Sequence, residues 1–81
     1  MPEVIIIINT DVGKEGDVLK ELTNIPEVES AYIVYGVYDL VAKVNTKDMD
    51  QLNLMISDRI RRIAGVRSTL TLVISKEHRK G

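Results

Sequence analysis

The pattern of apolar and polar positions along the chain predicts four strands and two helices. Glu3 to Thr10 is apolar on both faces, as expected of a central strand that is covered on two sides. Alternating positions predict further strands over Ser30 to Tyr35, Asp39 to Asn45 and Thr69 to Ser75. Apolar residues at helical spacing predict one helix that Pro26 stops and a second helix from Asp48 to Gly65. In the second helix, Asp48 at the N-cap with Gln51 three residues later resembles a capping box. The predicted order of elements is therefore βαββαβ.

The two halves of the chain resemble each other. Ile8-Asn9-Thr10 matches Val44-Asn45-Thr46 at a spacing of 36 residues. Ile25, Val28 and Ser30 match Ile63, Val66 and Ser68 at a spacing of 38. A twofold β-α-β repeat is the split form of the ferredoxin-like α+β fold, whose antiparallel sheet has the order 4-1-3-2. Right-handed crossovers place both helices on one face of that sheet and leave the other face open.

The open face of the sheet predicts self-association. Each Ile or Val left bare there would forgo about 1.5 to 3 kcal/mol of burial, and a domain of 81 residues has little stability to spare. A second copy is the expected cover, which gives a dimeric α+β barrel with the two sheets face to face. Thr69 and Thr71 on the last strand are candidates to line a pocket or seam, or are ordinary β-branched strand residues.

Composition excludes several classes of protein. The chain has no Cys, and its longest apolar run, Val4 to Ile8, is far too short for a membrane span or a signal peptide. These features predict a cytoplasmic protein without membrane association. His78 lies in a charged tail, and the sequence shows no paired buried carboxylates for acid–base chemistry. We therefore expect no enzymatic activity, no cofactor and no metal site.

Charge is divided unevenly along the chain. Up to Asp58 there are four basic and eleven acidic residues, a net charge of −7, whereas from Arg59 onward seven basic residues and one acidic residue give +6. The basic residues come from a helix, a loop and the tail, without interleaved aromatic residues. This pattern favours contacts between copies, or a solvated face, over specific binding of nucleic acid.

The centre of the chain, Tyr35-Gly36-Val37-Tyr38-Asp39-Leu40, is the candidate site. Gly36 permits a positive φ and so allows the strands on either side to form a hairpin. Asp39 at the end of the turn is a carboxylate beside backbone N–H groups that a folded turn leaves without strand partners, so this place suits a zwitterion. Alternatively, Asp39 only caps the turn and both tyrosines only pack.

One family shares these motifs. Gly36-Val37-Tyr38-Asp39-Leu40, with Ile25-Pro26-Glu27-Val28 before it and Ile63-Ala64-Gly65-Val66 leading into Thr69-Leu70-Thr71, resembles the effector (RAM, regulation of amino acid metabolism) domain of Lrp/AsnC transcriptional regulators. The resemblance spans nearly the whole chain. It implies homodimers that assemble into an octamer or similar ring, with an amino acid bound near the hairpin between dimers. The ligand-binding residues that it suggests are Tyr35, Gly36, Val37, Tyr38, Asp39, Leu40, Thr69 and Thr71. For the amino acid that the resemblance implies, backbone N–H groups near Gly36 to Leu40 would bind the carboxylate and Asp39 the ammonium, with Tyr35 and Tyr38 as apolar walls.

Two departures from the family qualify this interpretation. Family regulators carry an N-terminal helix-turn-helix, whereas Met1-Pro2-Glu3 leads directly into the first strand. We expect residues 1–81 to form a single stand-alone domain that does not read DNA and that mixes with full-length relatives. Tyr35 stands where many members have Thr or Ser, which changes the expected pocket volume. The alternatives are an ACT-like regulatory module and a small dimeric α+β barrel enzyme of the isomerase or monooxygenase type.

Overall fold

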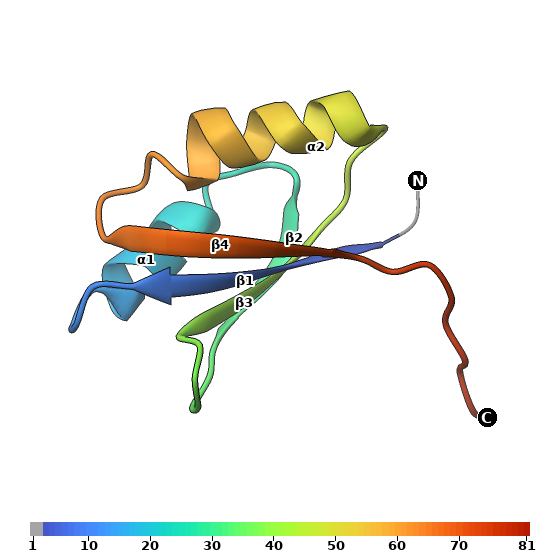
Figure 1. The fold of residues 1–81 in the computed structure, drawn as a ribbon, viewed down its shortest axis with the longest axis horizontal. Coiled ribbons are helices and arrows are strands. Elements are labelled where there is room, and N and C mark those ends of the chain that lie inside the picture. The colour runs from blue at the N-terminus through green and yellow to red at the C-terminus, as the bar shows by residue number, and fades with distance from the viewer. Residues whose placement is uncertain (1–2) are drawn as a thin grey trace.

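The computed structural model describes residues 3–81 and contains one four-stranded sheet (Figure 1). Its elements are β1 (Val4–Thr10), α1 (Glu15–Leu22), β2 (Val28–Ile33), β3 (Leu40–Val44), α2 (Met49–Met55), the π-helical turn η1 (Ile56–Ile60) and β4 (Val66–Val73). The strands are antiparallel in the order β2-β3-β1-β4, which is the predicted order 4-1-3-2 read from the other edge. The predicted ferredoxin-like α+β fold is confirmed.

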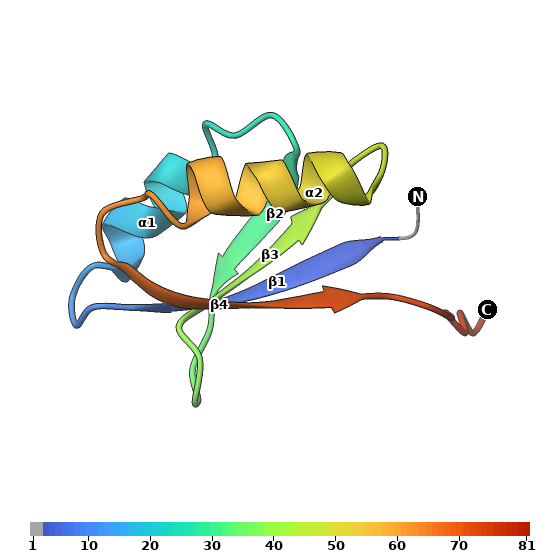
Figure 2. The same cartoon turned by 45° about the horizontal axis from the view of Figure 1, so that its top comes forward.

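Both helices lie on the same face of the sheet, as Figure 2 shows from the side. Val4, Ile6 and Ile8 of β1 point toward the helices and are fully buried, while Ile5 and Ile7 point to the open face and are half-buried. The core consists of apolar residues from β1, β3, both helical segments and the loop after α1: Val4, Ile6, Ile8, Val18, Leu22, Ile25, Leu40, Ala42, Val44, Leu52, Met55 and Ile60. One sheet face is therefore closed by its own subunit and the other is not.

The internal repeat has a physical counterpart in the loops before β2 and β4. Val28 N donates to Ile25 O at 3.0 Å, and Val66 N donates to Ile63 O at 3.1 Å, so matched residues make the same bond. The second repeat has a longer helical part, and η1 lies in that part. Arg61 N donates to Ile56 O at 2.9 Å, five residues back, which is the π-helical pattern. The wider turn of η1 accommodates part of the additional length of the second repeat.

The first residues of two strands were predicted wrongly, and for the same reason. β2 begins at Val28 rather than Ser30, and β4 begins at Val66 rather than Thr69. Val28 pairs with Val44 and Val66 pairs with Thr10, but each pairing is followed by a register shift. A β-bulge breaks the alternation of side chains, so the regular pattern is visible only beyond it. β2 also ends at Ile33, before the predicted Tyr35.

The two helices begin and end differently from each other. Asp48 caps α2 as predicted, because its Oδ1 accepts from Gln51 N at 2.8 Å. Gln51 Oε1 in turn accepts from Lys47 N at 2.6 Å, one residue before the donor of a regular capping box. α1 ends at Leu22, and a turn at Asn24 and Ile25 follows it directly. The prediction that Pro26 stops this helix was therefore wrong. Within residues 3–81, no helix has the length and apolar composition needed to cross a bilayer.

Candidate functional site

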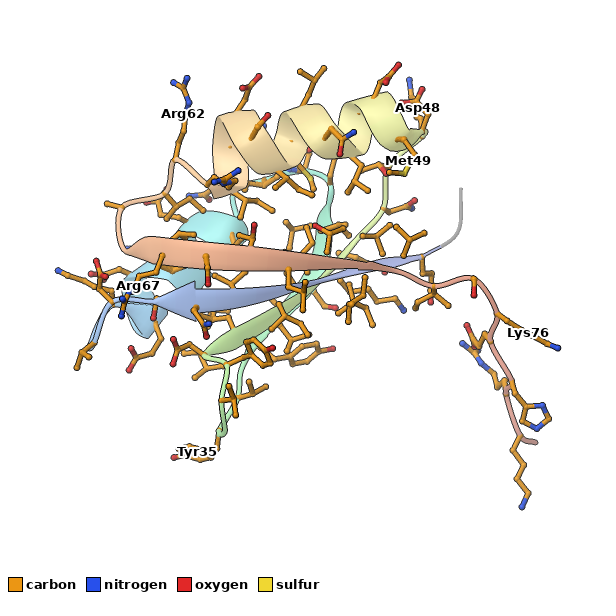
Figure 3. All side chains as sticks on the ribbon, viewed as in Figure 1. Tyr35, Asp48, Met49, Arg62, Arg67 and Lys76 are labelled. Carbon is orange, nitrogen blue, oxygen red and sulfur yellow. The ribbon has the colours of Figure 1, made fainter. Side chains whose placement is uncertain are left out.

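The hairpin between β2 and β3 extends beyond the edge of the sheet (Figure 1). Val34 N donates to Asp39 O at 2.9 Å and closes the loop. Gly36 has a φ of +133°, which confirms the positive φ predicted for it. Tyr35 is fully exposed and points away from the body of the subunit at the tip, as Figure 3 shows, and Val37 is mostly exposed. The tip therefore presents apolar side chains to its surroundings.

Replacing Gly36 with alanine is expected to destabilise the protein by about 1 kcal/mol through backbone strain alone. An added Cβ at Gly36 meets no atom within 4 Å, so steric overlap contributes nothing. Gly16 in α1 is the matched control, because it also has open space but does not have a positive φ. Gly16→Ala should raise the melting temperature through helix propensity while Gly36→Ala lowers it. Equal shifts in the melting temperatures of the two variants would contradict backbone strain at Gly36.

Asp39 links the base of the hairpin to the end of β1 through hydrogen bonds. The Asp39 backbone N–H donates to Ile8 O at 3.1 Å. Asp39 Oδ2 accepts from Thr10 N at 2.8 Å and from the Thr10 hydroxyl at 3.4 Å. Both side-chain bonds use Oδ2, so Oδ1 remains open to another donor. The backbone N–H of Asp39, one of those proposed to bind a ligand carboxylate, is already used within the fold.

A polar cavity of about 430 Å³ lies at this base, within the size range of small-molecule sites. Its lining residues come from β1, the hairpin and β4: Asn9, Thr10, Val37, Asp39, Arg67 and Ser68. Asn9 Nδ2 donates to Ser68 Oγ at 3.3 Å, whereas Asn9 Oδ1 is buried and has no hydrogen-bond partner among residues 3–81. Arg67 Nε lies 3.8 Å from Asp11 Oδ1, and the Arg67 side chain is 68% exposed. Groups of both charges therefore surround one cavity.

The structure spreads the predicted site residues over several parts of the subunit. Val37 and Asp39 line the cavity, while Tyr35 and Gly36 form the tip and Tyr38, which is about one-third exposed, lies between them and the sheet. The Leu40 side chain is fully buried in the core. Leu40 therefore offers a ligand no side-chain surface in this subunit.

Thr69 and Thr71 lie on β4, apart from the cavity. They pair with Ile8 and Ile6 of β1, and paired residues on antiparallel strands share a face. Both threonines are therefore half-buried on the face that the helices cover. The structure does not bring them together with Asp39 at the cavity, and β4 contributes Arg67 and Ser68 there instead.

Four cavity residues were missed by reasoning from the sequence: Asn9, Thr10, Arg67 and Ser68. The repeat already marked Asn9 and Thr10, because Asn-Thr follows an apolar strand in both halves. Arg67 carried no such signal. It was counted only as one member of the basic C-terminal third.

A larger cavity of about 860 Å³ lies between α1 and the loop after η1. Charged side chains of both signs line it, including Lys14, Lys20, Glu21 and Arg62. These side chains are exposed, and none of the buried unpaired polar atoms found among residues 3–81 lies there. The hairpin cavity, although smaller, is therefore the better candidate for a binding site.

Comparison with known proteins gives the family. The family model of the Lrp/AsnC ligand binding domain matches residues 3–81. The chain belongs to this family. The HTH-type transcriptional regulator FL11 of Pyrococcus furiosus is 35% identical over 75 residues, which are 93% of this chain and 49% of FL11. The chain thus spans about half the length of the curated relatives it matches, and the predicted resemblance to the effector domain is confirmed.

Solved structures agree with this membership. A hypothetical protein from Pyrococcus horikoshii is 38% identical with a TM-score of 0.86, and the match covers 96% of this chain and 94% of that one. The feast or famine regulatory protein from M. tuberculosis, complexed with L-methionine, is 28% identical with a TM-score of 0.82, over 99% of this chain and 54% of that one. The family model and the regulators among the relatives favour the Lrp/AsnC domain over the ACT-like and barrel-enzyme alternatives.

Proposed function

We propose that this Lrp/AsnC domain binds a free amino acid as an effector, at the hairpin and between dimers of a larger assembly. The observation that carries the proposal is the polar cavity where Asp39, the predicted partner of an ammonium group, lies at the hairpin base. The L-methionine complex of the related regulatory protein supports the class of ligand. Tyr35 and Val37, exposed at the tip, are then the apolar surface that meets a neighbouring dimer.

The dimer is proposed to form through the open faces of two sheets. Ile5, Ile7, Val41, Leu70 and Leu72 share this face by their pairing, and the two leucines are 46% and 43% exposed. Such a contiguous apolar face on a small domain is typical of an interface.

A cation, Lys43 of β3, also lies on the open face, where it pairs with Ile5. The Lys43 ammonium lies 2.9 Å from Glu3 Oε1 and 3.8 Å from Glu29 Oε2. The hydrogen bond to Glu3 and the negative charges of Glu3 and Glu29 raise the pKa of Lys43 above its ordinary value. Lys43 is therefore charged and already paired with carboxylates before the proposed interface forms. This pairing reduces the free-energy cost of burying its charge there.

The proposed role in regulation depends on other chains. The described residues, 3–81, contain the sheet, its two helical segments and the C-terminal segment, and none of them forms a helix-turn-helix. We propose that the domain affects transcription in an assembly with subunits that carry a DNA-binding domain, and that it responds to an amino acid within such an assembly.

Calorimetric titration with each of the twenty amino acids tests the proposed function. At least one is expected to bind with a dissociation constant below about 1 mM, a free energy of roughly −4 kcal/mol. Binding should saturate at a simple ratio of ligand to subunits, because the site repeats in each copy. Failure of all twenty to bind below that concentration would contradict the proposal.

A further inference from the structure

Arg67 owes its place at the hairpin cavity to an irregularity in the sheet. Asn9 pairs with Ser68 and Thr10 pairs with Val66, so Arg67 is an extra residue between two pairings. Successive residues of a regular strand point to opposite faces, yet Arg67 and Ser68 both line the same cavity. A β-bulge redirects a side chain in this way. The bulge therefore adds a cation to a cavity that already holds Asp39.

The polar groups of the cavity divide into donors and acceptors. Arg67 and the Ser68 hydroxyl, both from β4, are the donors. Asp39 Oδ1 and the buried, unpaired Asn9 Oδ1 are the acceptors. A buried oxygen without a partner is costly and is relieved when a ligand donates to it. Among residues 3–81, the guanidinium forms an ion pair only with Asp11, at 3.8 Å, and the side chain is largely exposed, so it can turn toward a bound anion.

We propose that this cavity binds the head group of the amino acid, with Arg67 holding the α-carboxylate and with Asp39 Oδ1 and Asn9 Oδ1 accepting from the α-ammonium. The proposal rests on the proposed function and names the residues that carry it out. An arginine binds a carboxylate through two parallel hydrogen bonds, which fixes both orientation and charge. The backbone N–H of Asp39 cannot do this, because it donates to Ile8 O.

The residues that line the cavity imply that the ligand's side chain binds to another surface. Val37 is the single apolar residue among those that line the cavity. A cavity with this lining recognises the two groups that all amino acids share and does not hold a long apolar side chain. The side chain of the ligand then leaves toward the hairpin tip, where a neighbouring subunit completes the site. One subunit thus provides affinity for amino acids, and the second provides the choice among them.

The experiment compares Arg67→Gln with Arg61→Gln, which removes the same charge from an exposed position outside the cavity. The probes are the tightest-binding of the twenty amino acids and its α-amide, which keeps the ammonium but has no carboxylate charge. Arg67→Gln should weaken binding of the amino acid about 10- to 100-fold, whereas Arg61→Gln should change it less than about twofold. Wild-type protein should bind the amide as weakly as Arg67→Gln binds the acid.

Binding of the amide by Arg67→Gln separates a role of Arg67 in binding from a structural role. If Arg67 acts on the carboxylate, Arg67→Gln should not weaken binding of the amide beyond the wild-type value. Equal losses for acid and amide, or wild-type affinity for the acid, would overturn the role of Arg67 while leaving amino acid binding in place. Absence of binding by the wild-type protein to all twenty amino acids would overturn the proposed function together with this inference.

Discussion

Replacing Ile7 with lysine is expected to convert the proposed assembly into monomers of 9.1 kDa. Ile7 lies at the centre of the open sheet face, paired with Val41 on β3 and with Leu70 on β4. In the proposed dimer, a lysine there would be buried without a carboxylate to pair with it, which costs several kcal/mol. About 4 kcal/mol corresponds to a thousandfold weaker association. Light scattering after size exclusion measures the change in mass.

Folding of the subunit should survive this change. Ile7 is only half-buried in the isolated subunit, and its side chain points away from the core that Ile6 and Ile8 help to form. Far-UV circular dichroism of Ile7→Lys should therefore match the wild type. Val12→Lys is the control, because Val12 is fully exposed in the loop between β1 and α1. It adds the same charge and should leave the mass of the assembly unchanged.

Two results would contradict the face-to-face dimer. A wild-type mass of one subunit at micromolar concentration would show that the open face is stable when exposed to solvent. An Ile7→Lys variant that retains the wild-type mass would place the interface elsewhere on the subunit. In the second case, amino acid binding at the hairpin would remain testable, because the cavity residues belong to one subunit.

The periodicity of the sequence was enough to predict the topology. A strand that is apolar on both faces belongs in the middle of a sheet, and β1 lies between β3 and β4. The repeat predicted two equivalent β-α-β units, and their equivalence extends to the bonds that Val28 and Val66 make. Gly36 and Asp48 were predicted correctly because a positive φ and a helix cap are local requirements of the backbone.

The site was harder to predict because it depends on contacts between distant segments. Asp39 and Thr10 are 29 residues apart, and no periodic pattern joins them. Arg67 reaches the cavity through a bulge, which is a property of pairing between two strands and not of either strand alone. Leu40 shows the opposite case: the family motif includes it, but the alternation of β3 buries its side chain.

Asp39 holds two roles that different substitutions should separate. Asp39→Ala removes the acceptor for Thr10 N, a donor in a residue that is only 6% exposed. An unsatisfied buried donor costs about 1 to 3 kcal/mol, and each kcal/mol lowers the melting temperature by roughly 4 to 8 °C in a domain of this size. Asp39→Asn keeps a carbonyl oxygen for Thr10 N and should therefore melt close to the wild type. Both variants lose the negative charge that the ammonium group needs.

Amino acid binding should consequently fall about 10- to 100-fold in Asp39→Asn without a matching loss of stability. Asp17→Asn, at an exposed position on α1, removes the same charge away from the cavity and should bind as the wild type does. Thermal melts and calorimetric titrations of the three variants give both quantities. Wild-type affinity in Asp39→Asn would show that Asp39 serves only to fasten the hairpin to β1. A large drop in its melting temperature would instead show that Thr10 requires the carboxylate itself, and the binding loss would then no longer report on the ligand.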